Sequence, residues 1–396
     1  MAGSPASVVT VTLFLILTTS RAITYNVANF GAKANGQTDS TTAFLKTWAS
    51  ACASTRTSTV YVPKGNFLVN AISLNGPCKN GIKFQMDGTL LAPSNYTAVG
   101  SSGYWILFHS VNGLSIVGGT VNARGAEFWA CRSKKNSGCP DGSGARSISF
   151  ANCANVVVDG LTSVNSQMFH LSLDTCENVT IKNVRITAPG SSPNTDGIHL
   201  MTTTGVTITS SSIRTGDDCI SIGEGNRNVK IDRIACGPGH GISIGSLGNS
   251  LKESGVQNVT VTNSVFTGTQ NGVRIKSWAR PSNGFAENVI FRNIVMKNVL
   301  NPIIIDQKYC PNNICPRQIS GVQISGVTYS NIRGTSASKV AVNFDCSSTN
   351  PCKGVILQNI NLVTSGGDAT TSFCDNGDGS IVGEVCSEKV VSKINC

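Results

Sequence analysis

A short phrase rich in β-branched residues recurs along most of the chain and constrains the fold more than any other feature. It opens with Asn or Gly and then places apolar residues at alternate positions, as in 155–161 (NVVVDGL), 178–184 (NVTIKNV), 205–211 (GVTITSS) and 228–234 (NVKIDRI). Further copies open at positions 258, 288, 321 and 354. Because side chains alternate along an extended backbone, an apolar period of two predicts strands and not helices. Repeats at intervals of roughly 23 to 33 residues predict a solenoid.

The repeat also indicates which solenoid forms. Leucine-rich repeats need an LxxLxL phrase and propellers need Trp-Asp signatures, and the sequence contains neither. Short strands between Gly, Asn and Ser turns predict a parallel β-helix, whose coils stack about 4.8 Å apart, and we expect it to be right-handed. The open ends of such a stack must be covered, and residues 39–52 (DSTTAFLKTWASAC) carry apolar residues at helical spacing after Asp39, the expected N-cap. We therefore predict a single all-β domain over 23–396 with a short N-terminal cap helix.

Composition and the first residues of the chain predict an exported protein. Charged residues make up 13% of the sequence and hydrophobic residues 40%, which excludes an acidic disordered chain and a coiled coil. Residues 8–17 form an apolar run that is too short to span a bilayer, and small residues follow at Ser20 and Ala22. This order is typical of a signal peptide, which we place at 1–22. All 15 cysteines lie beyond Ala22, as expected of a secreted protein.

The cysteine spacings predict local disulfides and no metal site. Four pairings are candidates: Cys52–Cys78, Cys219–Cys236, Cys346–Cys352, and Cys374 with either Cys386 or Cys396. The sequence has no CxxC pair and only four histidines, so we expect neither zinc nor any other cofactor. Asn-x-Thr acceptors for glycosylation, which suit the same extracellular compartment, occur at Asn95, Asn178 and Asn258.

A second phrase alternates with the first and gathers candidate functional residues at one edge of the predicted strands. It reads GIHL, CISI, GISI, GVRI and PIII at positions 197, 219, 241, 272 and 302. The residues that directly precede these copies form a column of Asp196, Asp218, His240, Asn271 and Asn301. Alternation points the apolar residues of each copy inward, so Arg274 and Lys276 should point outward into a groove floored by small residues. We expect both cations to be exposed and to contribute little to stability.

Each of these signals alone has an ordinary structural interpretation. The stretches 194–197 (NTDG), 216–218 (GDD) and 239–241 (GHG) are typical of turns, and two outward cations are typical of a protein surface. For each one alone we favour structure over function by about two to one. Their concentration on consecutive coils of a chain with few charges favours a functional site. The glycines at 237, 239 and 241 precede no predicted helix, which excludes a dinucleotide site.

At these motifs the chain resembles the plant polygalacturonases, glycoside hydrolases that cut the homogalacturonan of pectin. The family's four phrases match 194–196 (NTD), 216–218 (GDD), 239–241 (GHG) and 274–276 (RIK). The resemblance extends from 29–32 (NFGA) through 118–121 (GGTV) to 306–310 (DQKYC), which covers nearly all of the predicted mature chain. It implies a secreted, cell-wall enzyme with a pectin substrate. We expect a monomer with no nucleic-acid or membrane partner.

The resemblance also implies a role for each site residue in an inverting hydrolysis of the α-1,4 bond. Asp217 resembles the general acid, His240 resembles the residue that hydrogen-bonds this acid, and Asp196 and Asp218 resemble the pair that activates water. Asn194, Arg274, Lys276 and Tyr309 resemble the substrate-binding residues. Crowding among three carboxylates leads us to expect a raised pKa for Asp217. Adjacent coils place carboxylates about 5 Å apart, a spacing that favours retention for a simple pair, and we follow the resemblance in predicting inversion.

Three alternatives stay open beside a polygalacturonase that acts as an exo-enzyme from the non-reducing end. The sequence around 192–196 and 212–216 is most similar to that of the exopolygalacturonases of pollen. The insert from Cys131 to Cys139 offers a way to close one end of the groove, as exo action requires. An endo-acting polygalacturonase differs only in an open groove. A pectate lyase would need calcium and a basic residue at the α-proton. A non-catalytic pectin-binding β-helix would not need three converging carboxylates.

Overall fold

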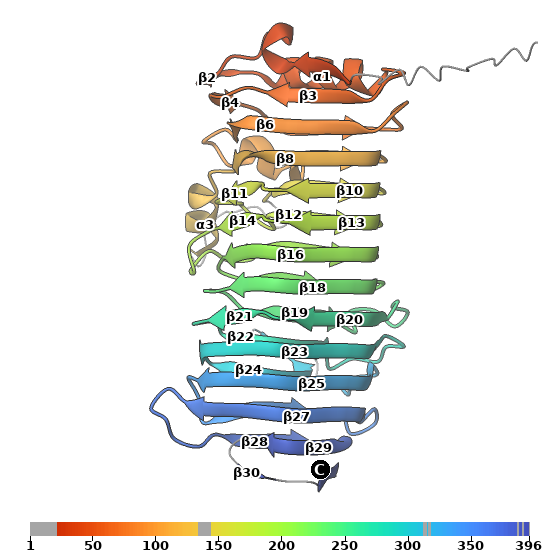
Figure 1. The fold of residues 1–396 in the computed structure, drawn as a ribbon, viewed down its shortest axis with the longest axis vertical. Coiled ribbons are helices and arrows are strands. Elements are labelled where there is room, and N and C mark those ends of the chain that lie inside the picture. Colours follow the sequence, from red (N-terminus) through yellow and green to blue (C-terminus); the bar gives the residue numbers. More distant parts are fainter. Residues whose placement is uncertain are drawn as a thin grey trace, which may run out of the picture.

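The computed structural model describes residues 22–133, 144–311, 315, 318–385, 388–389 and 392–395, and these form the predicted right-handed parallel β-helix (Figure 1). The strands stack coil upon coil along the long axis of the molecule, from the N-terminal end to the C-terminal end. Among the described strands, all pairs are parallel except those that β29 makes with β30 and β31. The predicted signal peptide lies outside the described residues, apart from Ala22. Among the described residues, no helix has the length and apolarity needed to cross a membrane.

Two sheets build the stack. The sheet of eleven strands comprises β5 (Ile72–Asn75), β7 (Tyr104–His109), β9 (Arg146–Ala151), β12 (Leu171–Asp174), β15 (Ile198–Met201), β17 (Ile220–Ile222), β19 (Ile242–Leu247), β22 (Asn271–Trp278), β24 (Asn301–Tyr309), β26 (Val340–Asp345) and β28 (Thr371–Asp375).

The second sheet comprises β1 (Ile23–Asn26), β2 (Asn35–Asp39), β3 (Ser58–Val62), β4 (Asn66–Leu68), β6 (Ile82–Leu91), β8 (Asn112–Asn122), β10 (Ala154–Asp159), β11 (Thr162–Val164), β13 (Glu177–Lys182), β14 (Arg185–Thr187), β16 (Thr204–Arg214), β18 (Arg227–Cys236), β20 (Val256–Thr262), β21 (Val265–Thr267), β23 (Phe285–Val299), β25 (Gln323–Ser336), β27 (Cys352–Thr364), β29 (Gly377–Val385), β30 (Glu388–Lys389) and β31 (Ser392–Asn395).

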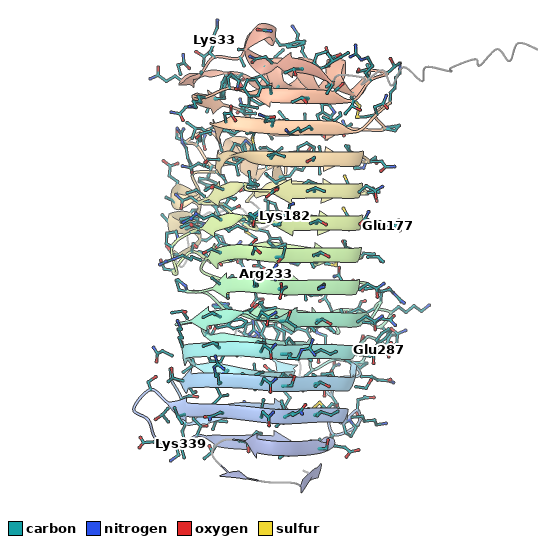
Figure 2. All side chains as sticks on the ribbon, viewed as in Figure 1. Lys33, Glu177, Lys182, Arg233, Glu287 and Lys339 are labelled. Atoms are coloured by element: carbon teal, nitrogen blue, oxygen red, sulfur yellow. A yellow bond between two sulfur atoms is a disulfide. The ribbon has the colours of Figure 1, made fainter. Side chains whose placement is uncertain are left out.

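The first repeated phrase forms the second sheet, with its apolar residues inside. Val156, Val179 and Val206 pair in register across β10, β13 and β16, and all three are buried. Alternate residues point outward, and Figure 2 shows Lys182 and Arg233 on this outer surface. Burial of apolar side chains stabilises the stack by about 25 cal/mol for each Å² removed from water. The period of two therefore predicts both the strand and its buried face.

The residue that opens the phrase adopts a left-handed backbone, which explains the choice of Asn or Gly. Asn155 and Asn178 have φ of 54°, and Gly205 has φ of 72°, a region that Asn and Gly tolerate best. One predicted copy is wrong by this criterion. Val289 pairs with Val327, so this coil's phrase opens at Gly326, which has a positive φ, and not at Gly321.

The ends of the stack are covered as a solenoid requires. Helix α1 (Thr41–Cys52) covers the N-terminal end and buries Phe44 and Trp48, as predicted (Figure 1). The predicted N-cap is wrong by one residue, because Ser40 occupies that position while Asp39 accepts a hydrogen bond from the NH of Thr41 at 2.9 Å. Three short helices complete the described secondary structure: η1 (Val27–Phe30), α2 (Thr97–Gly100) and α3 (Ala126–Ser133).

Three predicted disulfides are present: Cys52–Cys78, Cys219–Cys236 and Cys346–Cys352. A fourth, Cys310–Cys315, was not predicted. Cys131 and Cys374 are also disulfide-bonded, while their candidate partners at positions 139, 386 and 396 lie outside the described residues. The three acceptor asparagines, Asn95, Asn178 and Asn258, are all exposed.

Candidate active site

The register of the eleven-stranded sheet brings the predicted column together. Ile198, Ile220 and Ile242 pair in sequence across β15, β17 and β19, and all three point into the core. The residues two positions earlier therefore stack on consecutive coils, with Asp196 followed by Asp218 and then His240. Main-chain bonds fix this edge, since the NH of Gly197 donates to the carbonyl of Asp218 at 2.9 Å.

Glycines at this edge allow the coils to approach closely. A Cβ added at Gly216 would lie 2.0 Å from the carbonyl oxygen of Ser192, and one at Gly241 would lie 2.2 Å from that of Asn271. Real Cβ atoms cannot approach an oxygen so closely, so a larger residue would push the coils apart. The glycines of the GDD and GHG motifs thus set the spacing between the carboxylates and the imidazole.

Asp217 and His240 form a hydrogen-bonded pair at the surface of the column. Nδ1 of His240 lies 2.9 Å from Oδ1 of Asp217, and the NH of Asp218 donates to the same oxygen at 2.8 Å. Burial raises the pKa of Asp217, but the hydrogen bond and charge of His240, the charge of Lys276 and the Asp218 NH outweigh it, so the pKa lies below its usual value. The expected rise in the pKa of Asp217 is therefore wrong for the unliganded protein.

Asp196 has the opposite electrostatic environment. Its side chain is buried, and Oδ2 accepts a hydrogen bond of 2.6 Å from Oγ of Ser221. Burial raises the pKa of Asp196, and the negative charges of Asp217 and Asp218 add to the rise, while His199 opposes it. Nδ1 of His199 lies 3.8 Å from the Asp196 carboxylate. The structure thus separates the pKa values of two neighbouring carboxyl groups.

Asp218 is the most deeply buried of the three carboxylates, with 1% of its surface exposed. Oγ of Ser243 donates to Oδ1 at 2.7 Å and Nη2 of Arg274 donates to the same oxygen at 3.0 Å. Nζ of Lys276 donates to Oδ2, also at 3.0 Å. Two cations therefore neutralise Asp218 from the coil that follows His240.

These contacts correct the predicted exposure of the two cations. Arg274 is only 8% exposed and Lys276 only 7%. Alternation does direct both side chains away from the core, but Asp218 holds their charged ends and the ring of Tyr309 covers them. The ring centre of Tyr309 lies 5.1 Å from Nζ of Lys276 and 5.8 Å from Cζ of Arg274.

Asn194 and Tyr309, the remaining predicted binding residues, contact different members of the site: Asn194 contacts Asp217, and Tyr309 contacts the two cations. Nδ2 of Asn194 is 3.5 Å from Oδ2 of Asp217, and Oδ1 of Asn194 accepts a 3.3 Å bond from Arg132 of α3. Tyr309 packs edge-on against Trp278 at 5.1 Å. The structure thus brings all eight predicted catalytic and binding residues into one neighbourhood.

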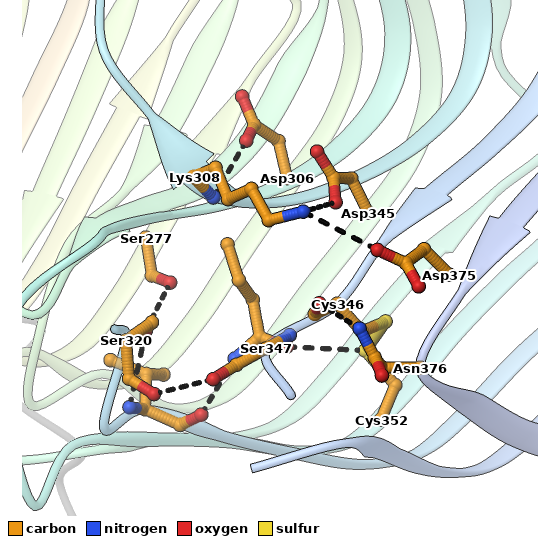
Figure 3. Close-up of a disulfide and its surroundings, with 12 residues drawn as sticks. Ser277, Asp306, Lys308, Ser320, Asp345, Cys346, Ser347, Cys352, Asp375 and Asn376 are labelled. Carbon is orange, nitrogen blue, oxygen red and sulfur yellow. Dashed lines mark hydrogen bonds and ion pairs between the residues drawn. A yellow bond between two sulfur atoms is a disulfide. The ribbon is translucent and has the colours of Figure 1, made fainter. Parts of the chain in front are cut away.

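Two hollows adjoin this neighbourhood. One of about 490 Å³ is lined by His240 together with Gly239, Gln270 and Leu300. Another of about 320 Å³ is lined by His199, Glu224, Glu253 and Trp278. Beyond the site, Lys308 bridges Asp345 and Asp375 next to the Cys346–Cys352 disulfide (Figure 3). The two hollows therefore lie beside His240 and beside His199.

One set of residues has the spacing of a metal site. One ligand atom each from Asp217, Asp218 and His240 lies within 4.8 Å of the others. Arg274 and Lys276 already ion-pair with Asp218 and would repel a further cation. These two cations therefore disfavour a metal ion at this position.

Sequence reasoning gave no role to the three polar residues that contact Asp196 and Asp218 from the strands. Ser221 and Ser243 each donate to the carboxylate of the preceding coil, and His199 contacts Ser221 at 2.7 Å. In the sequence these appear only as outward positions of the second phrase. A serine at such a position carries no distinct signal, although its repeated offset of 25 residues from each aspartate is visible once the register is known.

Neighbouring carboxyl groups in different electrostatic environments, with an imidazole bonded to one of them, are the groups that glycoside hydrolysis requires. The chain belongs to glycosyl hydrolases family 28, whose sequence profile matches residues 52–386.

Individual relatives agree with this assignment. The chain is 52% identical over 365 residues to a polygalacturonase of Prunus persica, covering 92% of each chain. It is 44% identical over 377 residues to an exopolygalacturonase of Platanus acerifolia, covering 94% of this chain and 97% of the relative. Among solved structures, an exopolygalacturonase from Thermotoga maritima shares the fold with a TM-score of 0.76 at 21% identity, over 91% of each chain.

Proposed function

We propose that this protein is a secreted polygalacturonase that removes galacturonate from the non-reducing end of homogalacturonan. The observation that carries the proposal is the pairing of Asp217 with His240 beside two further carboxylates, with Arg274 and Lys276 on the next coil. A glycosidase needs a proton donor and a water-activating carboxylate, and a substrate that carries carboxylates needs cations. The names of the peach and plane-tree relatives support the same substrate.

In the proposed reaction, Asp217 protonates the glycosidic oxygen while Asp196 and Asp218 hold and deprotonate a water on the opposite face of the sugar. The water oxygen bonds to the anomeric carbon as the bond to the leaving oxygen breaks, and the configuration inverts. The leaving hydroxyl retains the proton from Asp217, and the carboxylate pair retains the proton from water. Exchange with solvent then restores both groups.

The low pKa of Asp217 in the free protein is compatible with an acid role once substrate is bound. The hydrogen bond and charge of His240 lower this pKa most, and the charge of Lys276 lowers it further. A substrate carboxylate that binds Lys276 neutralises its charge, and the sugar excludes water from Asp217. Both changes favour the protonated carboxyl. We therefore propose that the substrate itself raises the pKa of its proton donor.

Arg274, Lys276, Tyr309 and Asn194 form the proposed substrate-binding set. Arginine can hold a carboxylate through two parallel hydrogen bonds, whereas lysine acts as a point charge. Tyr309 lies beside both cations and offers an aromatic surface to the sugar. Asn194 connects the Asp217 carboxylate to Arg132 of α3 and so places this helix at the margin of the site.

Exo action is the finer part of the proposal. It is supported by the name of the Platanus acerifolia relative and by the position of α3, from which Arg132 reaches the site. Most of the insert that follows Cys131 lies outside the described residues. The test is the size of the first products from long polygalacturonate. Exo action predicts galacturonate monomer from the earliest time point, and early mixed oligomers would establish endo action instead.

Secretion to the cell wall as a monomer, after removal of residues 1–22, completes the proposal. The local disulfides support an oxidising compartment, and the exposed acceptors Asn95, Asn178 and Asn258 support the same route. Mass spectrometry of the secreted protein should find Ile23 as its first residue and glycan on at least one acceptor. A secreted chain that retains residues 1–22 would refute the cleavage site.

A further inference from the structure

His199, Ser221 and Asp196 form a hydrogen-bonded chain whose proton positions can be derived. Oγ of Ser221 donates its single proton to Oδ2 of Asp196 over 2.6 Å. Nδ1 of His199 lies 2.7 Å from the same Oγ. Because the hydroxyl proton is already committed to Asp196, the bond from His199 must be donated by Nδ1–H. Each donor in the chain therefore points toward the Asp196 carboxylate.

Packing holds this chain in place. Ser221 is 3% exposed and lies in register with His199 on the neighbouring strand. The ring of Phe169 stacks on the imidazole of His199 with centres 4.3 Å apart, and the guanidinium of Arg146 lies 5.6 Å from the centre of the same phenyl ring. The imidazole plane is thus fixed between its serine and an aromatic neighbour.

Asp196 and Asp218 differ in the number of hydrogen bonds that their carboxylates accept from side chains. Both oxygens of Asp218 are occupied, Oδ1 by Ser243 and Arg274 and Oδ2 by Lys276. Among the described residues, no side chain donates a hydrogen bond to Oδ1 of Asp196. A carboxylate with a free oxygen has a site at which it can accept a proton from water, whereas both oxygens of Asp218 already accept hydrogen bonds.

We propose that Asp196 is the carboxylate that removes the proton from the attacking water, and that Ser221 and His199 are positioning residues that hold it in its ionised form. Asp218 orients the water and anchors Arg274 and Lys276. This inference rests on the proposed glycoside hydrolysis and assigns a different role to each of the two carboxylates, Asp196 and Asp218.

The charges around Asp196 set the sign of the expected effect. Asp217 and Asp218 face it from the next coil and oppose its ionisation, as does its burial. The positive charges of Arg274 and Lys276 are separated from Asp196 by Asp218, with which both pair. The positive charge of Arg146 is separated from it by the ring of Phe169. The donor chain is the nearest favourable interaction, so its removal should make Asp196 harder to ionise.

The test is the pH profile of kcat/KM for Ser221→Ala on polygalacturonate, beside Ser172→Ala as the matched control. Ser172 is buried one coil before His199 and donates to Ser149 instead of a carboxylate. We expect Ser221→Ala to lower kcat/KM about 10-fold to 100-fold. The limb of the pH profile that reports the ionisation of Asp196 should move upward by about one pH unit. Ser172→Ala should leave the profile unchanged.

Variants of His199 keep the proposal testable if Ser221→Ala fails to fold. His199→Ala removes the terminal donor and should shift the profile in the same direction. His199→Asn places an amide NH near the position of Nδ1 and should restore most of the wild-type profile. A Ser221→Ala enzyme with the wild-type profile, or an Asp196→Asn enzyme with near-normal turnover, would overturn the inference. A wild-type protein without hydrolytic activity would overturn the proposed function instead.

Discussion

Asp217 and His240 are joined twice, once through their side chains and once through the main chain. Nδ1 of His240 lies 2.9 Å from Oδ1 of Asp217, and the NH of His240 donates to the carbonyl of Asp217 at 2.8 Å. Both bonds cross from one coil to the next, so the main-chain bond fixes the two backbones relative to each other and the side-chain bond orients the carboxyl group. The stack of coils thus holds the proposed proton donor in a fixed orientation.

Asp217→Asn tests the proton donor. The amide cannot deliver a proton to the glycosidic oxygen, so kcat should fall by at least about 100-fold. The substitution keeps the shape of the side chain, and circular dichroism should match the wild type. A folded Asp217→Asn enzyme with near-normal turnover would falsify the acid assignment.

The pH dependence of activity should be a bell whose maximum lies on the acidic side of neutrality. The reaction needs one protonated and one ionised carboxyl, so rate is lost when both are protonated and when both are ionised. In the free protein the pKa of Asp217 is lowered and that of Asp196 is raised, so the two limbs of kcat/KM belong to the coupled pair. A profile that still rises above neutral pH would contradict this account.

The lowered pKa of Asp217 also predicts how its replacement changes stability with pH. A carboxyl whose folded pKa is depressed stabilises the fold above its unfolded pKa, and this contribution is lost as pH falls through the folded pKa. Asp217→Asn should therefore melt below the wild type near neutrality, and the two melting temperatures should converge in strong acid. Equal melting temperatures at all pH values would show that His240 and Lys276 do not stabilise the ionised form.

Lys276→Met and Arg274→Gln should impair both substrate recognition and folding. If the cations hold galacturonate carboxylates, each variant should lose roughly 2–4 kcal/mol in kcat/KM on polygalacturonate. Removing one partner of the buried Asp218 cluster should also cost about 3 kcal/mol of unfolding free energy. Kinetics and chemical denaturation of the same samples measure the two effects separately.

Methyl-esterified substrate is the control for carboxylate recognition. Its charges are masked, so the wild type should already cleave it poorly and each cation variant should add little further loss. Equal losses on both substrates would mean that Arg274 and Lys276 act only by holding Asp218 in place.

The Cys219–Cys236 disulfide should stabilise the catalytic edge, because Cys219 directly follows Asp218. It joins residues 17 positions apart, and closing a loop of this length contributes about 3 kcal/mol in the chain-entropy account. The double variant Cys219→Ser, Cys236→Ser should unfold at lower denaturant concentration and lose activity before it unfolds. The corresponding double variant at Cys52 and Cys78, which lies at the cap helix, should lose stability without this early loss of activity.

The fold and the column of Asp196, Asp218 and His240 could be predicted from the sequence because both follow from one local rule. A period of two specifies which residues face the core, and the same alignment places the preceding residues on one edge. The left-handed Asn or Gly that opens each phrase marks where the coils begin. The copy assigned to Gly321 was wrong because the flanking apolar pattern also fits there, and only strand pairing identifies Gly326.

Burial of the two cations could not be predicted in this way. Alternation specifies that Arg274 and Lys276 point away from the core, but exposure depends on what covers them. Here Asp218 lies in an earlier coil and Tyr309 on a later strand, and neither contact is encoded locally. The pKa of Asp217 was mispredicted for the same reason, since the charges of His240 and Lys276 outweigh its burial and crowding.

The most direct test of the central claim is the ¹H NMR spectrum of the first products that the wild-type protein releases from polygalacturonate. Inverting hydrolysis of an α-1,4 bond predicts new reducing ends that appear first as the β-anomer and equilibrate later. A first product in the α configuration would establish retention and contradict the proposed roles of Asp196 and Asp218. Signals of a C4–C5 double bond, with no equivalent of water added, would show that the protein is a lyase and contradict the account as a whole.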